Sequence, residues 1–342
     1  MTASHIPVLL QEVLDTLNPK SGEFFIDGTL GAGGHASAIV KKLVPGGTFL
    51  GIDRDKFAVD AFEKKSKEQN YALDKFLLLT ANYSQLETIL ANRFESKADG
   101  ILLDLGISSD QLGTPNQSQQ VKLGLGTGQA ERAGAFGSGG EQTSLGSEAP
   151  AEALPGSGRG FSFLVDDLLL MTYEEDATSV YEHLRRLSEK ELAEIIADFS
   201  QERFASKIAS SIKEASRQGR MQTTFDLVEA IKRAVPRNYE KGRIHPATRT
   251  FMALRIYANK EMEHLDKFLA SIPSLLSKKG RVGIISFHSL EDRRVKHAFK
   301  ELERTGDFEV LSKKAITASL KEMDENPRSR SAKYRVLKKN EL

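Results

Sequence analysis

Apolar residues in the first third of the chain form short continuous runs that alternate with stretches of helical periodicity. Runs of this length are typical of buried strands and predict strands at 23–27, 48–53, 75–80 and 99–106. Apolar residues at helical spacing predict helices at 7–17, 36–43, 54–67 and 83–94. Because strand and helix alternate, we expect a parallel, doubly wound α/β sheet.

The second half of the chain carries further helical and strand-like patterns. Helices are predicted at 180–187, 188–215, 224–234, 245–276 and 290–304. Residues Ser188 to Glu191 have the form of a capping box, and the apolar stripe behind them (Leu192, Ile195, Ile196, Phe199) is expected to be helix-packing core. Strands are predicted at 281–287, 308–311 and 333–337. The complete pattern predicts a Rossmann-like sheet of seven strands with an inserted α-helical subdomain.

Residues 113–158 differ in composition from the rest of the chain. They hold 11 of the 27 glycines, much Ser, Gln and Ala, and few large apolar side chains. So little apolar surface cannot offset the entropy of ordering the segment, and we expect a disordered insert. The predicted division is therefore a sheet domain at 1–112 and 236–342, the insert at 113–158, and the helical subdomain at 159–235.

Composition and charge narrow the classes of protein. With 48 basic and 47 acidic residues the net charge is +1, so any site for a polyanion has to be a local patch. The absence of cysteine excludes disulfides, thiolate metal sites and cysteine nucleophiles. No apolar run approaches the roughly 20 residues that span a bilayer, and the N-terminus does not have the pattern of a signal peptide. These features predict a cytoplasmic protein.

A glycine-rich turn after the first predicted strand carries informative chemistry. Residues Gly31 to Ala36 fit G-x-G-x-x-A, and Asp53 lies where a ribose-binding acid belongs, which suits a dinucleotide. Asp27 and Asp104, however, end two of the predicted strands, and their charges would repel a pyrophosphate. S-adenosylmethionine has no phosphate and carries an ammonium and a sulfonium, both of which carboxylates stabilise. The three strand-end acids therefore favour S-adenosylmethionine over NAD.

Several longer motifs resemble those of one enzyme family. In the first half they are His5 to Leu10, Asp27 to His35, Gly51 to Asp55, Leu103 to Leu112 and Arg159 to Phe163. In the second half they are His245 to Phe251, Ile285 to Arg293 and Asn326 to Ser331. They occur in the family's order over almost the whole chain, apart from residues 113–158. The chain thereby resembles the bacterial 16S ribosomal RNA (cytosine-N4) methyltransferase family, RsmH or MraW.

This resemblance implies a class I methyltransferase fold and S-adenosylmethionine-dependent methylation of the exocyclic N4 amine of a cytidine in the decoding centre (P site) of 16S rRNA. The small ribosomal subunit is the implied partner, and neither a metal site nor a membrane contact is predicted. Carried over onto matching positions, the donor-binding residues are Gly33, Gly34, His35, Asp53, Tyr83, Asp104 and Gln111. Tyr83 stands where the family has an aromatic beside the adenine, which makes sense as a stacking face.

The target amine needs its own contacts. A cytosine amine is a poor nucleophile, so the enzyme has to hold it in line and accept its protons by hydrogen bonds. The Asn-Pro-Pro-Tyr type of loop that many amino methyltransferases use is replaced here by Asp104 to Ile107. Asp104 and His288 are the candidates for polar contacts at the amine. The sequence does not identify a catalytic base, and the acidity of the product proton offers a reason why none is needed.

Three groups of basic residues predict an RNA-contacting surface. They are Arg328, Arg330, Lys333, Arg335, Lys338 and Lys339; Arg243, His245, Arg249 and Arg255; and Arg293, Arg294 and Lys296. Each group alone is typical of a solvated face, but together they can follow the phosphates of an RNA strand. The predicted contacts among them are Arg249, Arg293, Arg328 and Arg330.

The chain departs from the family pattern in two places. Leu170 and Thr172 stand where the family has Asp and Arg, which affects target positioning or the ordering of a lid. The insert at 113–158 follows the fourth predicted strand; an idle linker is expected, and a regulatory tether or a lid are the alternatives. Two other functions stay open: an amino methyltransferase acting on another RNA or on DNA, and a non-catalytic RNA-binding or ribosome-assembly factor that retains the donor fold.

Overall fold

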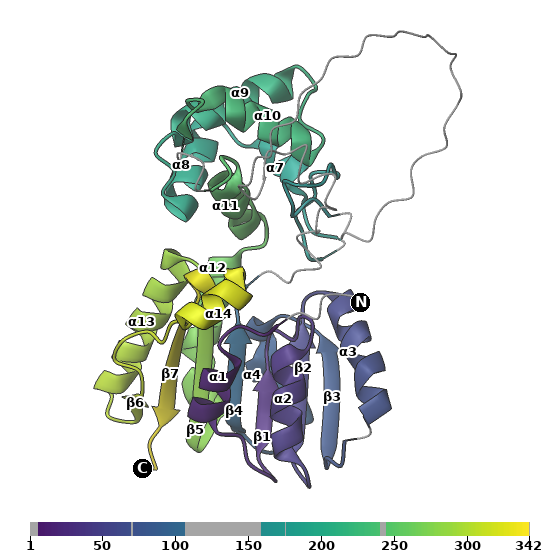
Figure 1. The fold of residues 1–342 in the computed structure, drawn as a ribbon, viewed down its shortest axis with the longest axis vertical. Coiled ribbons are helices and arrows are strands. Elements are labelled where there is room, and N and C mark those ends of the chain that lie inside the picture. Colours follow the sequence, from purple (N-terminus) through teal and green to yellow (C-terminus); the bar gives the residue numbers. More distant parts are fainter. Residues whose placement is uncertain (1–5, 70, 107–158, 175, 240–243, 342) are drawn as a thin grey trace, which may run out of the picture. The chain divides into compact units, whose positions relative to one another are not determined.

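The computed structural model describes residues 6–69, 71–106, 159–174, 176–239 and 244–341 (Figure 1). The predicted insert at 113–158, Gln111 and Arg243 lie outside these ranges. The chain divides into two compact units. The sheet unit comprises Met1–Ser108, Thr172–Ala177 and Ile256–Leu342, and the helical unit comprises Ser109–Met171 and Thr178–Arg255. The last division therefore falls later in the chain than the boundary predicted after residue 235.

The described part of the sheet unit contains one sheet of seven strands. They are β1 (Phe24–Asp27), β2 (Thr48–Asp53), β3 (Lys75–Thr80), β4 (Ala98–Asp104), β5 (Leu276–Ser286), β6 (Phe308–Val310) and β7 (Lys333–Lys339). Their order is β3-β2-β1-β4-β5-β7-β6. Strand β7 is antiparallel to both of its neighbours, and the other pairs are parallel. The predicted Rossmann-like sheet of seven strands is confirmed.

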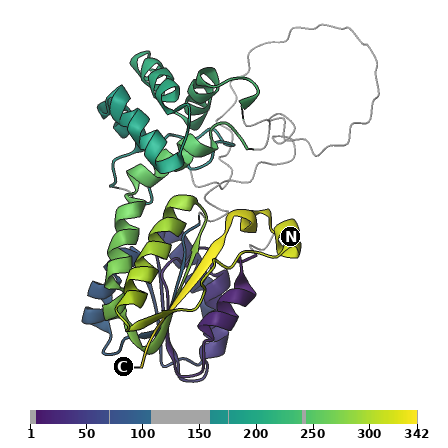
Figure 2. The ribbon, with the colours of Figure 1, turned by 90° about the vertical axis from the view of Figure 1, so that its left-hand side faces the viewer.

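Helices cover both faces of the sheet (Figure 2). Each face carries its own hydrophobic core. In β1, Phe24 and Ile26 belong to one core and Phe25 to the other, because successive side chains of a strand point to opposite faces. The first core includes residues of α4 (Leu86–Arg93), α12 (Glu261–Leu275) and α13 (Ser289–Arg304). The second includes residues of α1 (Leu10–Leu17), α2 (Gly34–Leu43) and α3 (Lys56–Gln69). Strands covered on both faces read as continuous apolar runs, which is why the sequence predicted them.

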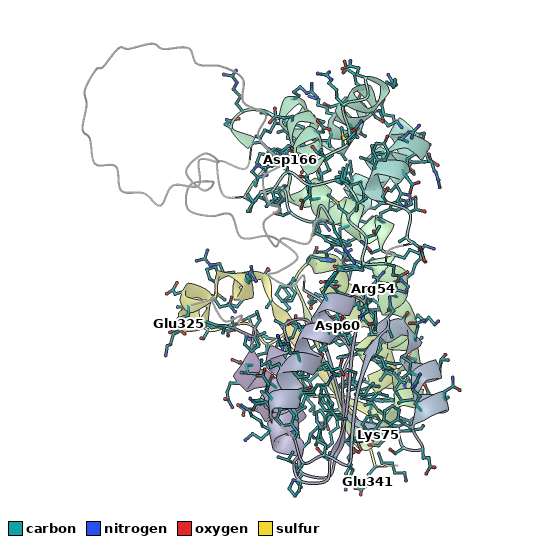
Figure 3. All side chains as sticks on the ribbon, turned by 90° about the vertical axis from the view of Figure 1, so that its right-hand side faces the viewer. Arg54, Asp60, Lys75, Asp166, Glu325 and Glu341 are labelled. Carbon is teal, nitrogen blue, oxygen red and sulfur yellow. The ribbon has the colours of Figure 1, made fainter. Side chains whose placement is uncertain are left out.

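The strand order reverses between β1 and β4, and open α/β sheets bind ligands outside the carboxyl ends of the strands at such a point. Asp27 ends β1, Asp53 ends β2 and Asp104 ends β4. Arg54 follows β2 at this edge, whereas Lys75 begins β3 at the opposite edge (Figure 3). The three acids thus share the ligand-binding edge of the sheet.

The helical unit contains α7 (Val180–Arg186), α8 (Glu189–Ser200), α9 (Ala205–Arg217), α10 (Thr224–Ala234) and the first part of α11 (Thr248–Ala258). The predicted capping box is confirmed: the Ser188 N–H donates to the Glu191 carboxylate at 2.7 Å, and the Glu191 N–H donates to Ser188 Oγ at 3.2 Å. Leu192 and Ile196 of the predicted stripe are fully buried. This unit therefore has a core of its own.

Two predictions of uninterrupted helix were wrong. The stretch 188–215 is split between α8 and α9, where Gln201 adopts a left-handed conformation and the Glu202 carboxylate accepts the N–H of Phe204 at 2.8 Å. The stretch 245–276 is split between α11 and α12 at Asn259 and Lys260, the latter with a φ of 49°. Apolar periodicity continues across both breaks, so the sequence pattern did not reveal them. Strand β5 also begins earlier, at Leu276, than the predicted residue 281.

Candidate functional site

The glycine turn joins β1 to α2 through backbone conformations that favour glycine. Gly31 and Gly33 have φ values of 47° and 70°, and Gly33 immediately precedes the first residue of α2. A Cβ on Gly33 would overlap the ring of Phe62, and one on Gly34 would lie 2.9 Å from Pro7. The close packing of the turn against its own protein therefore already requires these two glycines.

Asp53 fastens this turn to the end of β2. Its Oδ2 accepts the N–H of Gly31 at 2.8 Å, and its Oδ1 accepts the N–H of Asp55 at 2.9 Å. Burial raises the pKa of Asp53, and the two N–H donors oppose that rise. The carboxylate assigned to the ribose therefore also orders the turn beside it.

The ends of β1 and β4 are joined through Thr29. The buried Asp27 accepts the N–H of Thr29 at 3.1 Å, and the N–H of Asp104 donates to Thr29 Oγ1 at 2.6 Å. Burial raises the pKa of Asp27 to about 7, and the charges of Asp104 and Asp53 add to the effect. Three carboxyl groups at one edge are thus held where a cationic ligand would stabilise their charged forms.

His35 lies between the N-terminal segment and Asp104. Its Nε2 donates to the carbonyl of Val8 at 2.9 Å, which places the hydrogen on Nε2 because a carbonyl can only accept. Its Nδ1 lies 3.7 Å from Asp104 Oδ2. The imidazole is buried, and its bond to Val8 holds the N-terminal segment beside the turn.

Tyr83 lies next to the same turn. It begins the 3-10 helix η1 (Tyr83–Gln85), and its Cβ would be 3.3 Å from a Cβ placed on Gly28. Its ring packs edge-on against Phe268 at 5.9 Å. Burial raises the pKa of its hydroxyl, and the nearby charges of Glu261 and Glu291 act in the same direction. The structure therefore gathers all predicted donor-site residues that it describes: Gly33, Gly34, His35, Asp53, Tyr83 and Asp104. Gln111 lies outside the described residues.

Arg54 is a largely buried residue that the sequence did not single out. Its Nη1 donates to the carbonyl of Asn259 at 3.3 Å, its Nη2 lies 3.3 Å from Glu174 Oε1, and its guanidinium carbon lies 4.9 Å from the Tyr173 ring centroid. The Asn259 side chain also accepts the N–H of Tyr173 at 3.2 Å. Arg54 therefore ties Tyr173, Glu174 and the break before α12 to the ligand-binding edge. The sequence feature that could have pointed to Arg54 is its position directly after Asp53, the acid that ends β2.

His288 belongs to a cluster with Glu261 and Glu291. Single side-chain atoms of the three residues lie within 4.8 Å of one another, which is close enough to hold a metal ion. The Glu291 N–H, however, points to His288 Nδ1 at 3.5 Å, and His288 Nε2 lies 3.0 Å from Glu291 Oε1. With Nδ1 as the acceptor, the hydrogen is on Nε2 beside Glu291 Oε1, and a metal at Nε2 would have to replace it. The geometry favours an electrostatic cluster. The sequence feature that could have indicated this cluster is the H-x-x-E spacing of His288 and Glu291 at the start of a helix.

The predicted RNA contacts are held in different ways. In the helical unit, Arg249 Nη1 donates to the Tyr239 hydroxyl at 2.9 Å and lies 3.8 Å from the buried Glu202 carboxylate. Burial and Glu202 raise the pKa of Tyr239 to about 12. In the sheet unit, Arg293 is exposed on α13, and Arg328 and Arg330 belong to the 3-10 helix η3 (Pro327–Ser331), which follows α14 (Leu320–Glu325).

Part of the predicted basic segment 327–339 stabilises the fold. Arg335 Nε donates to Asp292 Oδ1 at 2.7 Å, and Lys333 Nζ donates to Asp292 Oδ2 at 3.3 Å. Burial alone would raise the pKa of Asp292, but the two cations lower it. Lys339 Nζ donates to two carbonyls at the end of α12. The cations of this segment are therefore not all available to a ligand.

Two motif residues of the helical unit form an aromatic stack. The rings of Phe163 and His245 are 4.6 Å apart and 6° from parallel, and Phe251 packs edge-on against Phe163. The Ala247 N–H donates to His245 Nδ1 at 3.2 Å, and burial together with Lys232 lowers the pKa of His245. The ring is therefore mostly neutral at pH 7.

The two departures from the family pattern lie in packed segments. The Leu170 carbonyl accepts the N–H of Val180 at the start of α7 at 2.8 Å, within the helical unit. Thr172 is buried in the sheet unit. Leu170 and Thr172 are uncharged, so neither supplies the charge that the family's Asp or Arg has at that position.

The fold defines the class of protein. A doubly wound sheet in which the last strand lies antiparallel between the fifth and sixth is the sheet of the class I S-adenosylmethionine-dependent methyltransferases. The chain is a methyltransferase of this class, and S-adenosylmethionine is its methyl donor. A sequence model of the MraW methylase family matches residues 2–119 and 151–340, and the chain belongs to that family.

Individual relatives match over nearly the full length. The chain is 37% identical to the "Ribosomal RNA small subunit methyltransferase H" of Myxococcus xanthus, over 99% of both chains. It is 34% identical to the protein of the same name from Persephonella marina, over 98% of this chain and 99% of that one. A solved structure of a putative rRNA-methylase from Clostridium thermocellum aligns with a TM-score of 0.43 and 10% identity, over 98% of this chain and 99% of that one. No helix within the described ranges has the length and apolarity to cross a membrane.

Asp27 should make the stability of the ligand-free protein depend on pH. The folded protein holds this proton up to about pH 7, whereas the unfolded chain loses it near its ordinary pKa of 3.8. The stabilising contribution is therefore complete below about pH 4 and is lost as pH rises through 7. It amounts to about 4 kcal/mol at about 1.4 kcal/mol per pH unit. Urea unfolding at a series of pH values should show this fall, and Asp27→Asn should remove it.

The matched control for this experiment is Asp15→Asn, which changes an exposed carboxyl group on α1. It should leave the pH dependence of unfolding unchanged. An Asp27→Asn protein whose unfolding free energy falls with pH as steeply as that of the wild type would show that Asp27 is not the group responsible.

Proposed function

We propose that the protein transfers a methyl group from S-adenosylmethionine to the exocyclic N4 amine of a cytidine in the decoding centre of 16S rRNA. The gathering of Asp27, Asp53 and Asp104 at the switch point of the sheet is the observation that carries the donor part of this proposal. The names of the full-length relatives support small-subunit rRNA as the substrate. The cytidine target rests on the resemblance of the motifs around His245 and His288.

The residues at this edge fit a cationic donor. When bound, S-adenosylmethionine supplies an electrophilic methyl group on a sulfonium. Asp27 and Asp104 would stabilise positive charge there, and the low polarity around the buried Asp27 strengthens that attraction. We assign the ribose to Asp53, the adenine to Tyr83, and the methionine portion to the turn at Gly33 to His35. Gln111 completes the proposed donor set.

The acceptor amine requires a hydrogen-bond acceptor in line with the donor. Asp104 offers a carboxylate at the end of β4 and is our candidate for holding the amine hydrogens. His288 carries its hydrogen on Nε2 when its Nδ1 accepts the Glu291 N–H. That hydrogen faces Glu291 Oε1 in the ligand-free protein. To contact the cytosine ring as a donor, Nε2 would have to exchange this neighbour for the base, so we assign His288 to base orientation and not to proton removal.

One experiment separates this function from its alternatives. The protein is mixed with small ribosomal subunits and S-adenosylmethionine labelled in the methyl group, and labelled nucleosides are identified and mapped. Label in N4-methylcytidine at the decoding centre is the expected result. Label in another RNA or in DNA would instead establish a different amino methyltransferase, and tight binding of subunits without transfer would indicate a non-catalytic factor.

Charge reversal at Arg328 and Arg330 should weaken the use of the RNA substrate. Both residues lie in the short helix η3, and phosphate contacts depend on their positive charge. In an Arg328→Glu/Arg330→Glu protein we expect the KM for small subunits to rise by about tenfold or more. The Kd for S-adenosylmethionine, measured by calorimetry, should stay within a factor of about two.

A Lys313→Glu/Lys314→Glu protein is the control, because it loses the same charge from two exposed positions of the same unit. If both double variants raise KM equally, the effect is one of net charge and η3 is not a contact. Loss of donor binding with an unchanged KM for subunits would refute the assignment outright.

A further inference from the structure

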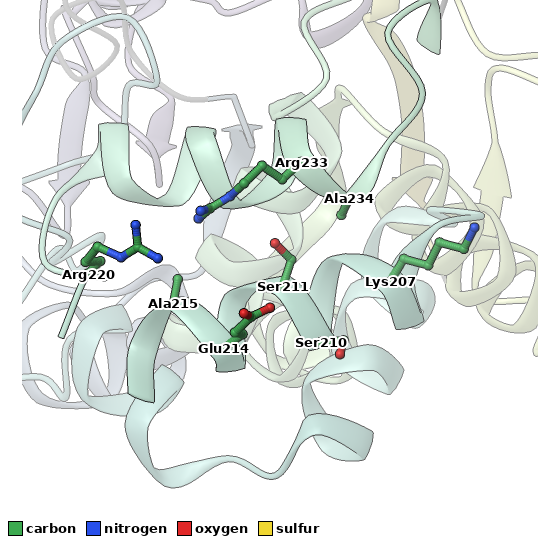
Figure 4. A pocket seen from close by; sticks show the side chains of 8 residues that line it. All are labelled: Lys207, Ser210, Ser211, Glu214, Ala215, Arg220, Arg233 and Ala234. Carbon is green, nitrogen blue, oxygen red and sulfur yellow. The ribbon is translucent and has the colours of Figure 1, made fainter. Parts of the chain in front are cut away.

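The helical unit contains a basic hollow that the donor site does not use. It has a volume of about 550 Å³ and lies between α9 and the end of α10 (Figure 4). Its lining residues are Lys207, Ser210, Ser211, Glu214, Ala215, Arg220, Arg233 and Ala234. The residues at 207, 210, 211 and 214 follow the spacing that places side chains on one face of a helix. One face of α9 thus forms a wall of this hollow.

The cations of the hollow are not neutralised by the protein. In the ranges that the structure describes, Lys207, Arg220 and Arg233 form no ion pair with a carboxylate. All three are exposed. The guanidinium groups of Arg220 and Arg233 extend toward one another across the gap between the helices (Figure 4). By contrast, Arg186, Lys190 and Lys232 of the same unit each pair with a glutamate.

The one acid in the lining is engaged by a neighbour. Glu214 Oε1 accepts a hydrogen bond from Gln218 Nε2 at 3.4 Å, and the Gln218 oxygen in turn accepts one from Arg220 Nη2. Gln218 therefore places Glu214 and Arg220 in one polar chain. Three cations against one carboxylate leave the hollow with an excess of positive charge.

These features match the chemistry of a phosphodiester backbone. Two converging guanidinium groups can each donate two parallel hydrogen bonds to phosphate oxygens, and a lysine at the far end adds a point charge. The hydroxyl of Ser210 adds a polar group to the wall. From Lys207 to Ala215 the helix advances by about 12 Å, which is longer than one phosphate group. An extended strand with successive phosphates fills such a length better than a single small anion.

We propose that this hollow of the helical unit binds the sugar-phosphate backbone of the RNA substrate, through Arg220, Arg233 and Lys207. The proposal rests on the proposed function, since it names a contact for the same RNA. Its role is affinity and not sequence recognition, because contacts to phosphates position a protein on RNA and carry no base information.

The test compares two proteins that lose the same charge from the same unit. Arg220→Glu/Arg233→Glu alters the hollow, and Arg186→Glu/Lys190→Glu alters two cations that already pair with glutamates. The Kd for small subunits and for protein-free 16S rRNA is measured between about 50 and 200 mM salt. For the hollow variant we expect about tenfold weaker binding. We also expect the slope of log Kd against log salt to fall by about 1.4, at about 0.7 for each lost contact. The control should keep the wild-type slope.

Equal losses in the two variants, or an unchanged slope in both, would overturn the proposal. So would weaker binding to subunits together with unchanged binding to protein-free RNA, because the hollow would then contact a protein. The neutral variant Arg220→Gln/Arg233→Gln tests whether the effect is due to misfolding. Its circular dichroism and donor affinity should equal those of the wild type, and its slope of log Kd against log salt should fall by the same amount as in the charge-reversed variant. Failure of the proposed function is distinguishable, because the wild-type protein itself would then not methylate subunits.

Discussion

Replacing Asp104 by alanine is expected to abolish methyl transfer, lowering kcat by at least about 100- to 1000-fold. That is the loss typical of removing one preorganised group that stabilises charge in the transition state. Asp104 ends β4 at the switch point, with its backbone N–H fixed by Thr29 and its Oδ2 3.7 Å from His35 Nδ1. The fixed backbone keeps this carboxylate at the ligand-binding edge of the sheet. Transfer of labelled methyl groups to small subunits, under single-turnover conditions, measures the effect.

One further variant and one control show how Asp104 acts. Asp104→Asn keeps the shape and a hydrogen-bond acceptor but removes the charge, so it separates electrostatic stabilisation from amine positioning. Asp74→Asn, at an exposed carboxyl group just before β3, is the control and should transfer methyl groups at the wild-type rate. Turnover by Asp104→Ala within about threefold of the wild type would remove Asp104 from the site.

Replacing Gly33 by alanine should destabilise the folded protein by about 2–5 kcal/mol and weaken donor binding with it. The left-handed φ of 70° costs a residue with a Cβ about 1–2 kcal/mol. The added methyl would also overlap the buried ring of Phe62, and overpacking of this kind costs about 1–3 kcal/mol. Urea unfolding gives the first effect, and calorimetric titration with S-adenosylmethionine gives the second.

Gly22 provides a matched control for the cost of placing a residue with a Cβ in a left-handed backbone conformation. Gly22 has a similarly positive φ of 82°, but nothing lies within 4 Å of a Cβ placed there, so Gly22→Ala should show the conformational penalty alone. Combining Gly33→Ala with Phe62→Leu should recover part of the loss, because the two changes share one contact. Equal destabilisation by Gly33→Ala and Gly22→Ala would mean that the Phe62 contact contributes nothing.

The sheet was predictable because both of its faces are covered. Strands β1 to β4 consequently read as apolar runs, and the acids at three of their ends indicate the ligand-binding edge from the sequence alone. The Phe62 contact that requires glycine at 33 was not predictable, since the G-x-G pattern does not reveal which neighbour approaches the turn.

Long-range polar contacts account for most of what the sequence did not reveal. The break between α11 and α12 coincides with Asn259, which binds Arg54 and Tyr173 from distant parts of the chain. The pairing of Arg335 with Asp292 likewise joins a strand to a separate helix and removes a cation from the predicted RNA-contacting surface. Helical periodicity and charge counts describe local sequence only, so neither could indicate these partners.

The order of the strands also affects how the chain folds as it is synthesised. Strands β1 to β4 emerge first, but the partner that covers the free edge of β4 is β5, which begins only at Leu276. Closing so long a connection adds little to the entropic penalty on the finished protein, because that penalty grows only logarithmically with length, but it slows folding. Until β5 is made, the apolar edge of β4 from Ile101 to Leu103 remains open to pairing with other chains. In this interval of translation the growing chain is therefore exposed to aggregation and open to chaperone binding.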